Sequence, residues 1–288
     1  MSSYQLQTRA ISVGKWVVIA LLVIAAVFPF YYMIVMSFVR IEDLLRNPLQ
    51  LFPDLATITT ETYRRVLAPE DEGGFGFSRF MRNSAIVATG ATVLTMLLAI
   101  PASYAMTRLR FAGRRQVSAL FLAVYMFPTI IIAVPIFVGF QVIGLGSSLP
   151  GLTIAYIALT VPVCVHMLRS YMQSIPEAID EAAYMDGANR WQIMTRITVP
   201  LTMPTLMSTA LFAFMIAWNE FLFALLFLTA KKDLWTVSLG LNLLSDGQEV
   251  PKTILMAGSV LLTVPIVALY AIAERYLTEG LTAGASKG

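Results

Sequence analysis

The sequence predicts an all-α integral membrane protein with six membrane-spanning helices. Hydrophobic residues make up 58% of the 288 residues and charged residues only 13%, which is far more apolar than a soluble globular protein. Residues 16–39 carry no charge over a length that suffices to cross a bilayer. Residues 116–168 contain no Asp, Glu, Lys or Arg, and this stretch is too long for one span, so it is expected to form two.

The apolar stretches define a single transmembrane domain over residues 16–277. Residues 40–82 form the longest polar connection, which is interpreted either as a contact surface on the outer face or as a plain solvated loop. Prolines inside the apolar stretches, such as Pro128 and Pro162, are expected to bend the helices. The predicted spans are residues 16–39, 83–107, 116–139, 151–172, 203–229 and 253–276.

The basic residues predict which side of the membrane each connection faces. Residues 1–15 hold two basic residues and no acid, and residues 108–115 hold four arginines and no acid. Short, purely basic segments stay in the cytoplasm. Both termini, including the tail 278–288, are therefore expected to be cytoplasmic. The net charge of +3 is explained by topology, and no nucleic-acid partner is predicted.

A polar segment over residues 174–201 separates two apolar stretches and predicts two short helices. Ser174 and Glu177 have the spacing of a capping box, as do Asn189 and Gln192. Gly187 between them is expected to take the left-handed conformation that ends a helix, and a proline at position 200 is expected to stop the second one. The pair is interpreted either as a surface helix at the lipid headgroups or as a knob that docks on another protein.

The spacing of residues within this segment carries a family resemblance. Glu181, Ala182 and Ala183 are followed after three residues by Gly187, and after nine more by a run from Ile197 to Pro200. This pattern resembles the EAA loop of ABC importer permeases, and nearly the whole chain is similar to the maltose-type (MalG-like) sugar permease branch. The position before the proline is Val199, where the family usually has leucine.

The resemblance implies a MetI/MalG-like permease fold with an EAA-type cytoplasmic coupling helix, in a bacterial cytoplasmic (inner) membrane. It implies a sugar importer, for a di- or oligosaccharide, whose partners are a cytoplasmic ABC ATPase dimer, a second homologous permease and an extracytoplasmic sugar-binding protein. ATP and Mg would be bound by the ATPase, and this chain would bind no cofactor. The implied ATPase-coupling residues are Glu181, Ala182, Ala183, Asp186, Gly187, Ile197 and Pro200.

One carboxylate, Glu220, lies inside the predicted fifth span. Burying a charge at that depth costs about 3 kcal/mol, so the side chain should face protein or a water-filled path. It is interpreted either as a packing residue or as a wall of the substrate path, together with Asn219. Two aromatic residues of the third span, Tyr125 and Phe127, offer stacking faces to a sugar or serve as ordinary packing.

No catalytic or metal-binding pattern is found in the sequence. It contains no GxxxxGK[ST], no HExxH and no CxxC, and it has one histidine and one cysteine, so neither an enzyme nor a metal site is predicted. The alternative function is an ion-coupled secondary transporter of a small polar solute. That class usually has internal repeats and several ionisable residues at membrane depth, and neither feature is evident here.

Overall fold

A computed structural model describes residues 3–46, 52, 58–245 and 250–285, and these residues are helical apart from their connections. Within this part of the chain the one β-type pairing is an isolated bridge between Val39 and Ile58. The all-α fold class is confirmed. The chain divides into two compact units, Met1–Phe77 with Leu243–Leu261 and Ser78–Asn242 with Leu262–Gly288, and each is described by itself.

The first unit is built around α1 (Ser3–Ser37), which contains the predicted first span and begins well inside the predicted polar terminus 1–15. Many large apolar side chains of α1, including Trp16 and Phe30, are exposed, as suits a helix in contact with lipid. Its end is held by a hydrogen bond of 2.8 Å between the hydroxyls of Ser37 and Tyr63. The other elements of this unit are α2 (Ile41–Arg46), α3 (Glu61–Leu67), the 3-10 turn η2 (Glu70–Glu72) and the beginning of α14 (Lys252–Ala285).

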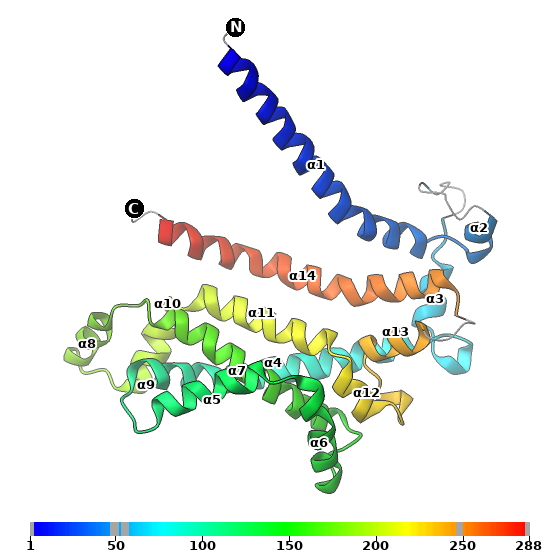
Figure 1. The fold of residues 1–288 in the computed structure, drawn as a ribbon. Helices are drawn as coiled ribbons and strands as arrows, with labels where there is room; N and C mark the ends of the chain where they lie inside the picture. Colours follow the sequence, from blue (N-terminus) through cyan, green and yellow to red (C-terminus); the bar gives the residue numbers. More distant parts are fainter. Residues whose placement is uncertain (1–2, 47–51, 53–57, 246–249, 286–288) are drawn as a thin grey trace. The chain divides into compact units, whose positions relative to one another are not determined.

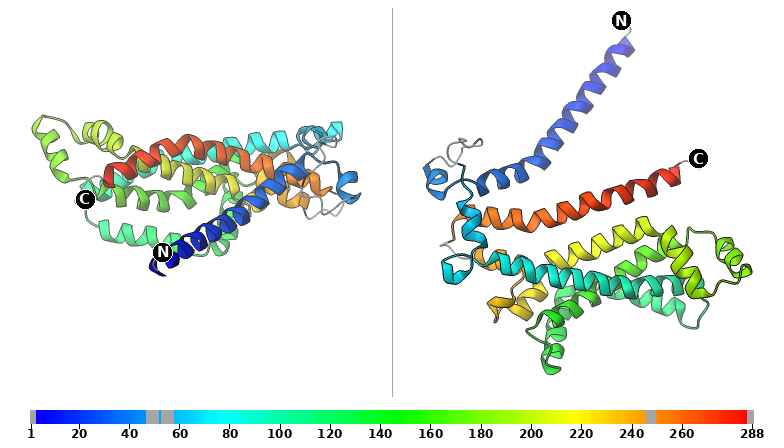
Figure 2. Two further views of the ribbon diagram at one scale, coloured as in Figure 1. Left: turned by 90° about the horizontal axis from the view of Figure 1, so that it is seen from above. Right: turned by 180° about the vertical axis from the view of Figure 1, so that it is seen from behind.

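The second unit holds the remaining helices (Figure 1). In chain order they are α4 (Phe77–Arg108), α5 (Arg114–Met126), α6 (Thr129–Val142), α7 (Leu149–Met172), α8 (Glu177–Met185), α9 (Arg190–Ile193), the π-turn η3 (Met194–Thr198), α10 (Val199–Leu201), α11 (Met203–Asn219), α12 (Leu222–Leu228), the 3-10 turn η4 (Lys232–Leu234), α13 (Val237–Ser245) and the rest of α14. Within it α7 packs against both α11 and α5. The short helices α8 and α9 project beyond the ends of α7 and α11, as both views in Figure 2 show.

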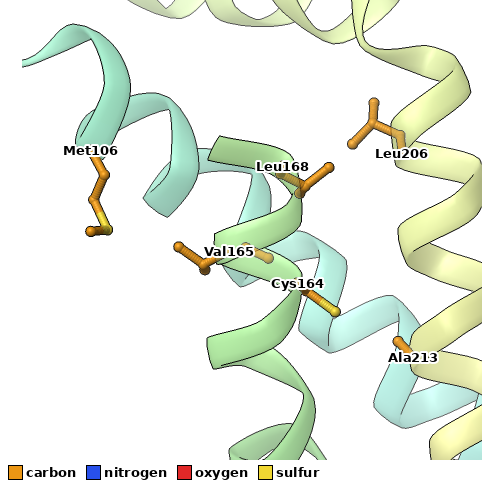
Figure 3. Close-up of a cluster of buried hydrophobic side chains, with 7 residues drawn as sticks. Met106, Cys164, Val165, Leu168, Leu206 and Ala213 are labelled. Atoms are coloured by element: carbon orange, nitrogen blue, oxygen red, sulfur yellow. The ribbon is translucent and has the colours of Figure 1, made fainter. Parts of the chain in front are cut away.

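The core of the second unit lies where α4, α7 and α11 meet. Figure 3 shows the cluster, in which side chains from all three helices gather around Cys164 and Leu168. Its buried members are Ala99, Met106, Cys164, Val165, Leu168, Leu206 and Ala213. Nearby, the hydroxyls of Thr95 and Thr160 share a buried hydrogen bond of 2.7 Å, which ties α4 to α7. The expectation that the lone cysteine serves packing agrees with its burial.

Two predicted spans are divided in the structure. Residues 116–139 do not form one helix, because Phe127, the residue before Pro128, is extended (φ −75°, ψ 132°). A proline pushes the residue before it out of the helical region, so Pro128 separates α5 from α6 and does not merely bend one helix. Residues 203–229 are likewise divided, at Glu220 (φ −64°, ψ 132°), into α11 and α12.

Four helices in the described part of the chain are long and apolar enough to cross a membrane. They contain Ile11–Ser37, Phe77–Arg108, Leu149–Met172 and Lys252–Glu274, and correspond to the predicted first, second, fourth and sixth spans. A multi-pass membrane protein follows. The third and fifth predicted spans correspond to the divided pairs α5–α6 and α11–α12.

Candidate functional site

The polar segment between α7 and α11 folds as two short helices, and its first helix ends as the sequence predicts. Gly187 has a left-handed backbone (φ +84°). Its N–H donates to the carbonyl of Tyr184 (3.0 Å), and the next N–H, of Ala188, donates to the carbonyl of Ala183 (3.0 Å). This pattern satisfies the last carbonyls of α8 and turns the chain sharply.

The predicted start of α8 is wrong. The helix begins after Pro176, which makes no side-chain cap, and the hydroxyl of Ser174 donates back to the carbonyl of Tyr171 (2.7 Å). The second capping box is confirmed, because Asn189 accepts from the N–H of Gln192 (2.9 Å) while the Gln192 side chain accepts from the N–H of Asn189 (2.8 Å). Since both orphan N–H groups are satisfied, α9 has a defined starting point.

The second helix does not stop at Pro200. It passes through the π-turn η3 and ends at Thr202, where the run Arg190–Leu201 meets α11 at a bend of 81°. Proline lacks an N–H and cannot continue the normal ladder, and a wider π-turn just before it accommodates this loss. Pro200 itself is exposed, Ile197 is half-buried, and Thr198 between them is buried.

The helix α8 has two distinct faces. Ala183 is buried (8% exposed) and the carboxylate of Asp180, three residues before it, points to the same side. The opposite side is exposed and carries Ala178, Glu181, Ala182 and Met185, at the spacing of one helical face. Met185 is 88% exposed, which is unusual for a large apolar side chain. The outer face is thus small, partly apolar and bordered by one carboxylate.

A buried ion pair anchors this segment to the end of α4. The Arg108 guanidinium donates from Nε to the Asp180 carboxylate (2.6 Å) and from Nη2 to the carbonyl of Ile175 (2.8 Å). The side chains of Arg108 and Asp180 are only 7% and 14% exposed. A buried charge requires a partner, so neither side chain can leave this arrangement without leaving the other unpaired.

A second contact joins α8 to α9 beside this ion pair. The Nε–H of Arg190 donates to the Tyr184 hydroxyl (2.9 Å), and this hydrogen bond raises the pKa of Arg190. Tyr104, Arg108 and Asp180 adjoin these residues around a cavity of about 170 Å³. Sequence reasoning missed Arg108 and Asp180, although Asp180 lies beside Glu181 on the opposite face of a short helix.

The predicted coupling residues therefore fall into two groups. Glu181 and Ala182 are on the exposed face of α8, and Asp186 and Gly187 are exposed at its end. Ala183, by contrast, is buried against the body of the second unit. The predicted set is brought together around one helix and its turn, except for Ile197 and Pro200, which lie one short helix further along.

Glu220 lies at the break between α11 and α12, and its hydrogen bonds explain the break. Its carboxylate accepts from the N–H groups of Phe223 (3.0 Å) and Ala224 (3.2 Å), as a capping side chain does at a helix start. It also accepts from the hydroxyl of Tyr156 on α7 (2.8 Å), whose side chain is fully buried. The packing interpretation of Glu220 is therefore strongly represented in the geometry.

Glu220 also borders a cavity of about 480 Å³ in the second unit. The cavity is mainly apolar, and its wall comes from α5, α6, α7, α11 and α12. Asn219 turns its amide back to the carbonyl of Met215 (2.9 Å) on its own helix. Phe127 is exposed and is not among the residues that form the wall, and the side chain of Tyr125 lies outside the described part of the structure. The four predicted path residues are not gathered at one point.

Comparison with known proteins gives a consistent assignment. Residues 91–282 match the family model described as "Binding-protein-dependent transport system inner membrane component". The chain is 38% identical to the inner membrane ABC transporter permease protein YcjP of Escherichia coli (strain K12), over 96% of each chain. It is 37% identical to the trehalose/maltose transport system permease protein MalG of Thermococcus litoralis, over 93% of this chain and 94% of that one.

The fold agrees with that assignment. The structure superposes with a TM-score of 0.78 on a chain of a bacterial ABC transporter involved in the import of the acidic polysaccharide alginate, at 22% identity and over 96% of this chain and 98% of that one. The family model matches well over half of the chain, and the relatives match almost all of it. The chain therefore belongs to the family of inner membrane components of binding-protein-dependent transport systems.

Proposed function

We propose that this chain is a permease subunit of an ATP-driven, binding-protein-dependent importer of a sugar, a di- or oligosaccharide. The observation that carries the proposal is the two-faced helix α8, with Asp180 paired to Arg108 on one side and an exposed, partly apolar face on the other. The relatives named for trehalose and maltose support a sugar as the substrate. The chain itself supplies the path and the coupling, and it performs no chemistry.

The exposed face of α8 is the proposed docking surface for a cytoplasmic ABC ATPase dimer, which would bind ATP and Mg. Glu181 offers a carboxylate to a basic side chain, Ala182 permits close approach, and Met185 supplies adaptable apolar contact. Helices that dock in this way place small and apolar residues of one face in a groove of the partner. This placement requires the segment 174–201 to be cytoplasmic, in agreement with the purely basic segments 1–15 and 108–115.

The Arg108–Asp180 ion pair is the proposed link from the ATPase to the membrane helices. When the ATPase dimer closes and moves α8, the pair moves the end of α4, and the bend at Thr202 passes the displacement to α11. Both helices contribute to the core around Cys164, so they move as packed elements. The half-helices α11 and α12 meet at Glu220, beside the largest cavity described above, which is the proposed position of the sugar path.

The other proposed partners follow from the family. A second, homologous permease would complete the pore, and an extracytoplasmic binding protein would deliver the sugar to the outer connections, including residues 40–82. Both termini are placed in the cytoplasm by the same orientation.

Affinity purification of the tagged chain from native membranes in mild detergent, with mass spectrometry of the recovered proteins, tests the assembly. The expected result is an ABC ATPase, a second permease and an exported binding protein, followed by sugar-stimulated ATP hydrolysis in proteoliposomes. Recovery of this chain alone would contradict the proposal. Uptake that survives ATP depletion but collapses with an uncoupler would instead support an ion-coupled secondary transporter.

A further inference from the structure

A second cavity, of about 180 Å³, lies between α5 and α7 of the second unit, at the end of α7 that carries its basic residues. Pro162, His166 and Arg169 follow one stripe of α7 at positions i, i+4 and i+7. Ser118 and Phe121 face them from α5, three residues apart. The cavity has no part in the coupling or the sugar path described above.

One end of this cavity is cationic. The guanidinium of Arg169 donates from Nη1 to the Ser118 hydroxyl, while its Nε–H is buried and has no hydrogen-bond partner in the described part of the structure. A buried donor without a partner is costly, so an acceptor at this position would be favourable. His166, one turn earlier, is exposed, and none of the described residues that line the cavity is acidic. The missing ligand chemistry is an anion with strong hydrogen-bond acceptors.

The other end of the cavity is apolar. Phe121, Pro162 and Val163 form its wall, and two core residues, Met106 and Val165, complete it. Pro162 and Val163 also line the larger cavity of about 480 Å³, so the two spaces share a wall along α7. A soluble anion would use only the cationic end. A molecule that uses both ends carries an anionic group and a hydrocarbon chain.

The position along the membrane fits such a molecule. Arg169 lies three residues before the end of α7 at Met172, and Arg108, at the end of α4, reaches the carbonyl of Ile175 just beyond that end. This end of the helices also carries the arginine-rich segment 108–115, which is expected at the cytoplasmic surface. Basic pockets between membrane helices on that side bind the head groups of anionic lipids.

We propose that this cavity is a binding site for one anionic phospholipid. The lipid phosphate would be held by Arg169, Ser118 and His166, and one acyl chain would run along Phe121 and Val163. In this position the lipid would satisfy the Arg169 Nε–H and fill the space between α5 and α7. A phosphate group is the shared chemistry of a lipid and of inorganic phosphate, and the apolar wall favours the lipid.

The test uses the assembled importer, purified, depleted of lipid and titrated with phosphatidylglycerol or phosphatidylcholine while native mass spectrometry measures the bound lipid. Three variants are compared with the wild type: Arg169→Gln removes the cationic end, Val163→Phe fills the apolar end and leaves Arg169 in place, and Arg115→Gln removes a charge of the same segment that does not line the cavity. Arg169→Gln is expected to lower phosphatidylglycerol binding about fivefold, the effect of one arginine on an anionic lipid. Val163→Phe is expected to lower it by a similar factor, and Arg115→Gln to leave this site occupied.

The thermal midpoint of the same complexes separates the two sources of phosphate. For a lipid site, phosphatidylglycerol raises the midpoint of the wild type, whereas inorganic phosphate and phosphatidylcholine do not. If inorganic phosphate stabilises the complex, and Val163→Phe binds phosphatidylglycerol as the wild type does, the site takes a soluble anion and the proposal is wrong. Equal lipid binding by all variants would also overturn it, and would indicate that the second permease covers this cavity. Because neither readout depends on sugar uptake, failure here leaves the proposed transport function untouched.

Discussion

The ion pair between Arg108 and Asp180 gives the sharpest test of how the coupling segment works. Asp180→Asn keeps the size of the side chain and removes its charge, so the Arg108 guanidinium would remain buried beside a neutral amide. Arg108 would keep its hydrogen bond to the carbonyl of Ile175. The change therefore removes the charge pairing and little else.

The magnitude follows from the burial of the two side chains, which are 7% and 14% exposed. At this burial solvent screens the pair weakly, and removing one partner of a buried pair costs about 3 to 5 kcal/mol. Since the amide of asparagine can still accept one hydrogen bond, the lower value, about 3 kcal/mol, is expected. An energy of that size changes the ratio of anchored to released coupling segment by roughly 150-fold.

The assay compares sugar uptake with ATP hydrolysis in the reconstituted complex. Asp180→Asn is expected to reduce uptake at least tenfold while the ATPase still binds and hydrolyses ATP, because the outer face of α8 is unchanged. The matched control is Glu177→Gln, which removes an exposed carboxylate from the first turn of the same helix and should cost less than about 1 kcal/mol. The reversed pair, Arg108→Asp with Asp180→Arg, should recover part of the uptake.

Uptake by Asp180→Asn within twofold of the wild type would refute the reasoning. A reversed pair no more active than either single change would show that the two side chains do not act as a pair.

Three further changes separate docking, turning and packing. Met185→Glu, at an 88% exposed position, should leave the permease folded but weaken copurification of the ATPase at least tenfold; normal recovery of the ATPase would contradict the docking surface. Gly187→Val places a β-branched residue at φ +84°, which strains the backbone by about 1 to 3 kcal/mol, and uptake should fall while insertion, measured by membrane yield, continues. Glu220→Ala leaves the buried hydroxyl of Tyr156 without its partner and should lower the free energy of unfolding by about 2 to 3 kcal/mol, whereas Glu220→Gln should retain much of that stability, so an altered sugar affinity in Glu220→Gln would assign this residue to the path.

Much of the fold could be predicted because membrane helices are recognised by their apolar length. The stretches that begin near residues 16, 83, 151 and 253 all proved to be long helices. The continuity of the other two was wrong for local reasons. Pro128 makes its neighbour extended, and the carboxylate of Glu220 offers the backbone a competing hydrogen-bond partner that ends one helix and starts the next.

The candidate site could be predicted only in its local part. The left-handed glycine and the Asn189–Gln192 capping box depend on residues a few positions apart, so the sequence displays them. The partner of Asp180 is 72 residues away along the chain, and nothing in the local pattern distinguishes Arg108 from the other arginines of its segment. Spatial pairing of this kind depends on how α4 and α7 end side by side, which is a property of the packed helices.

The π-turn η3 explains why the spacing between the glycine and the proline in this segment matters more than most of the side chains within it. A π-turn accommodates one residue more than a regular helical turn, and each residue of a helix advances its face by about 100°. Deleting one residue between Met194 and Thr198 would restore a regular turn and rotate everything that follows by that angle. Leu206 and Ala213, which now face the core, would then point elsewhere, so the length of this segment sets the rotational register of α11 in the membrane.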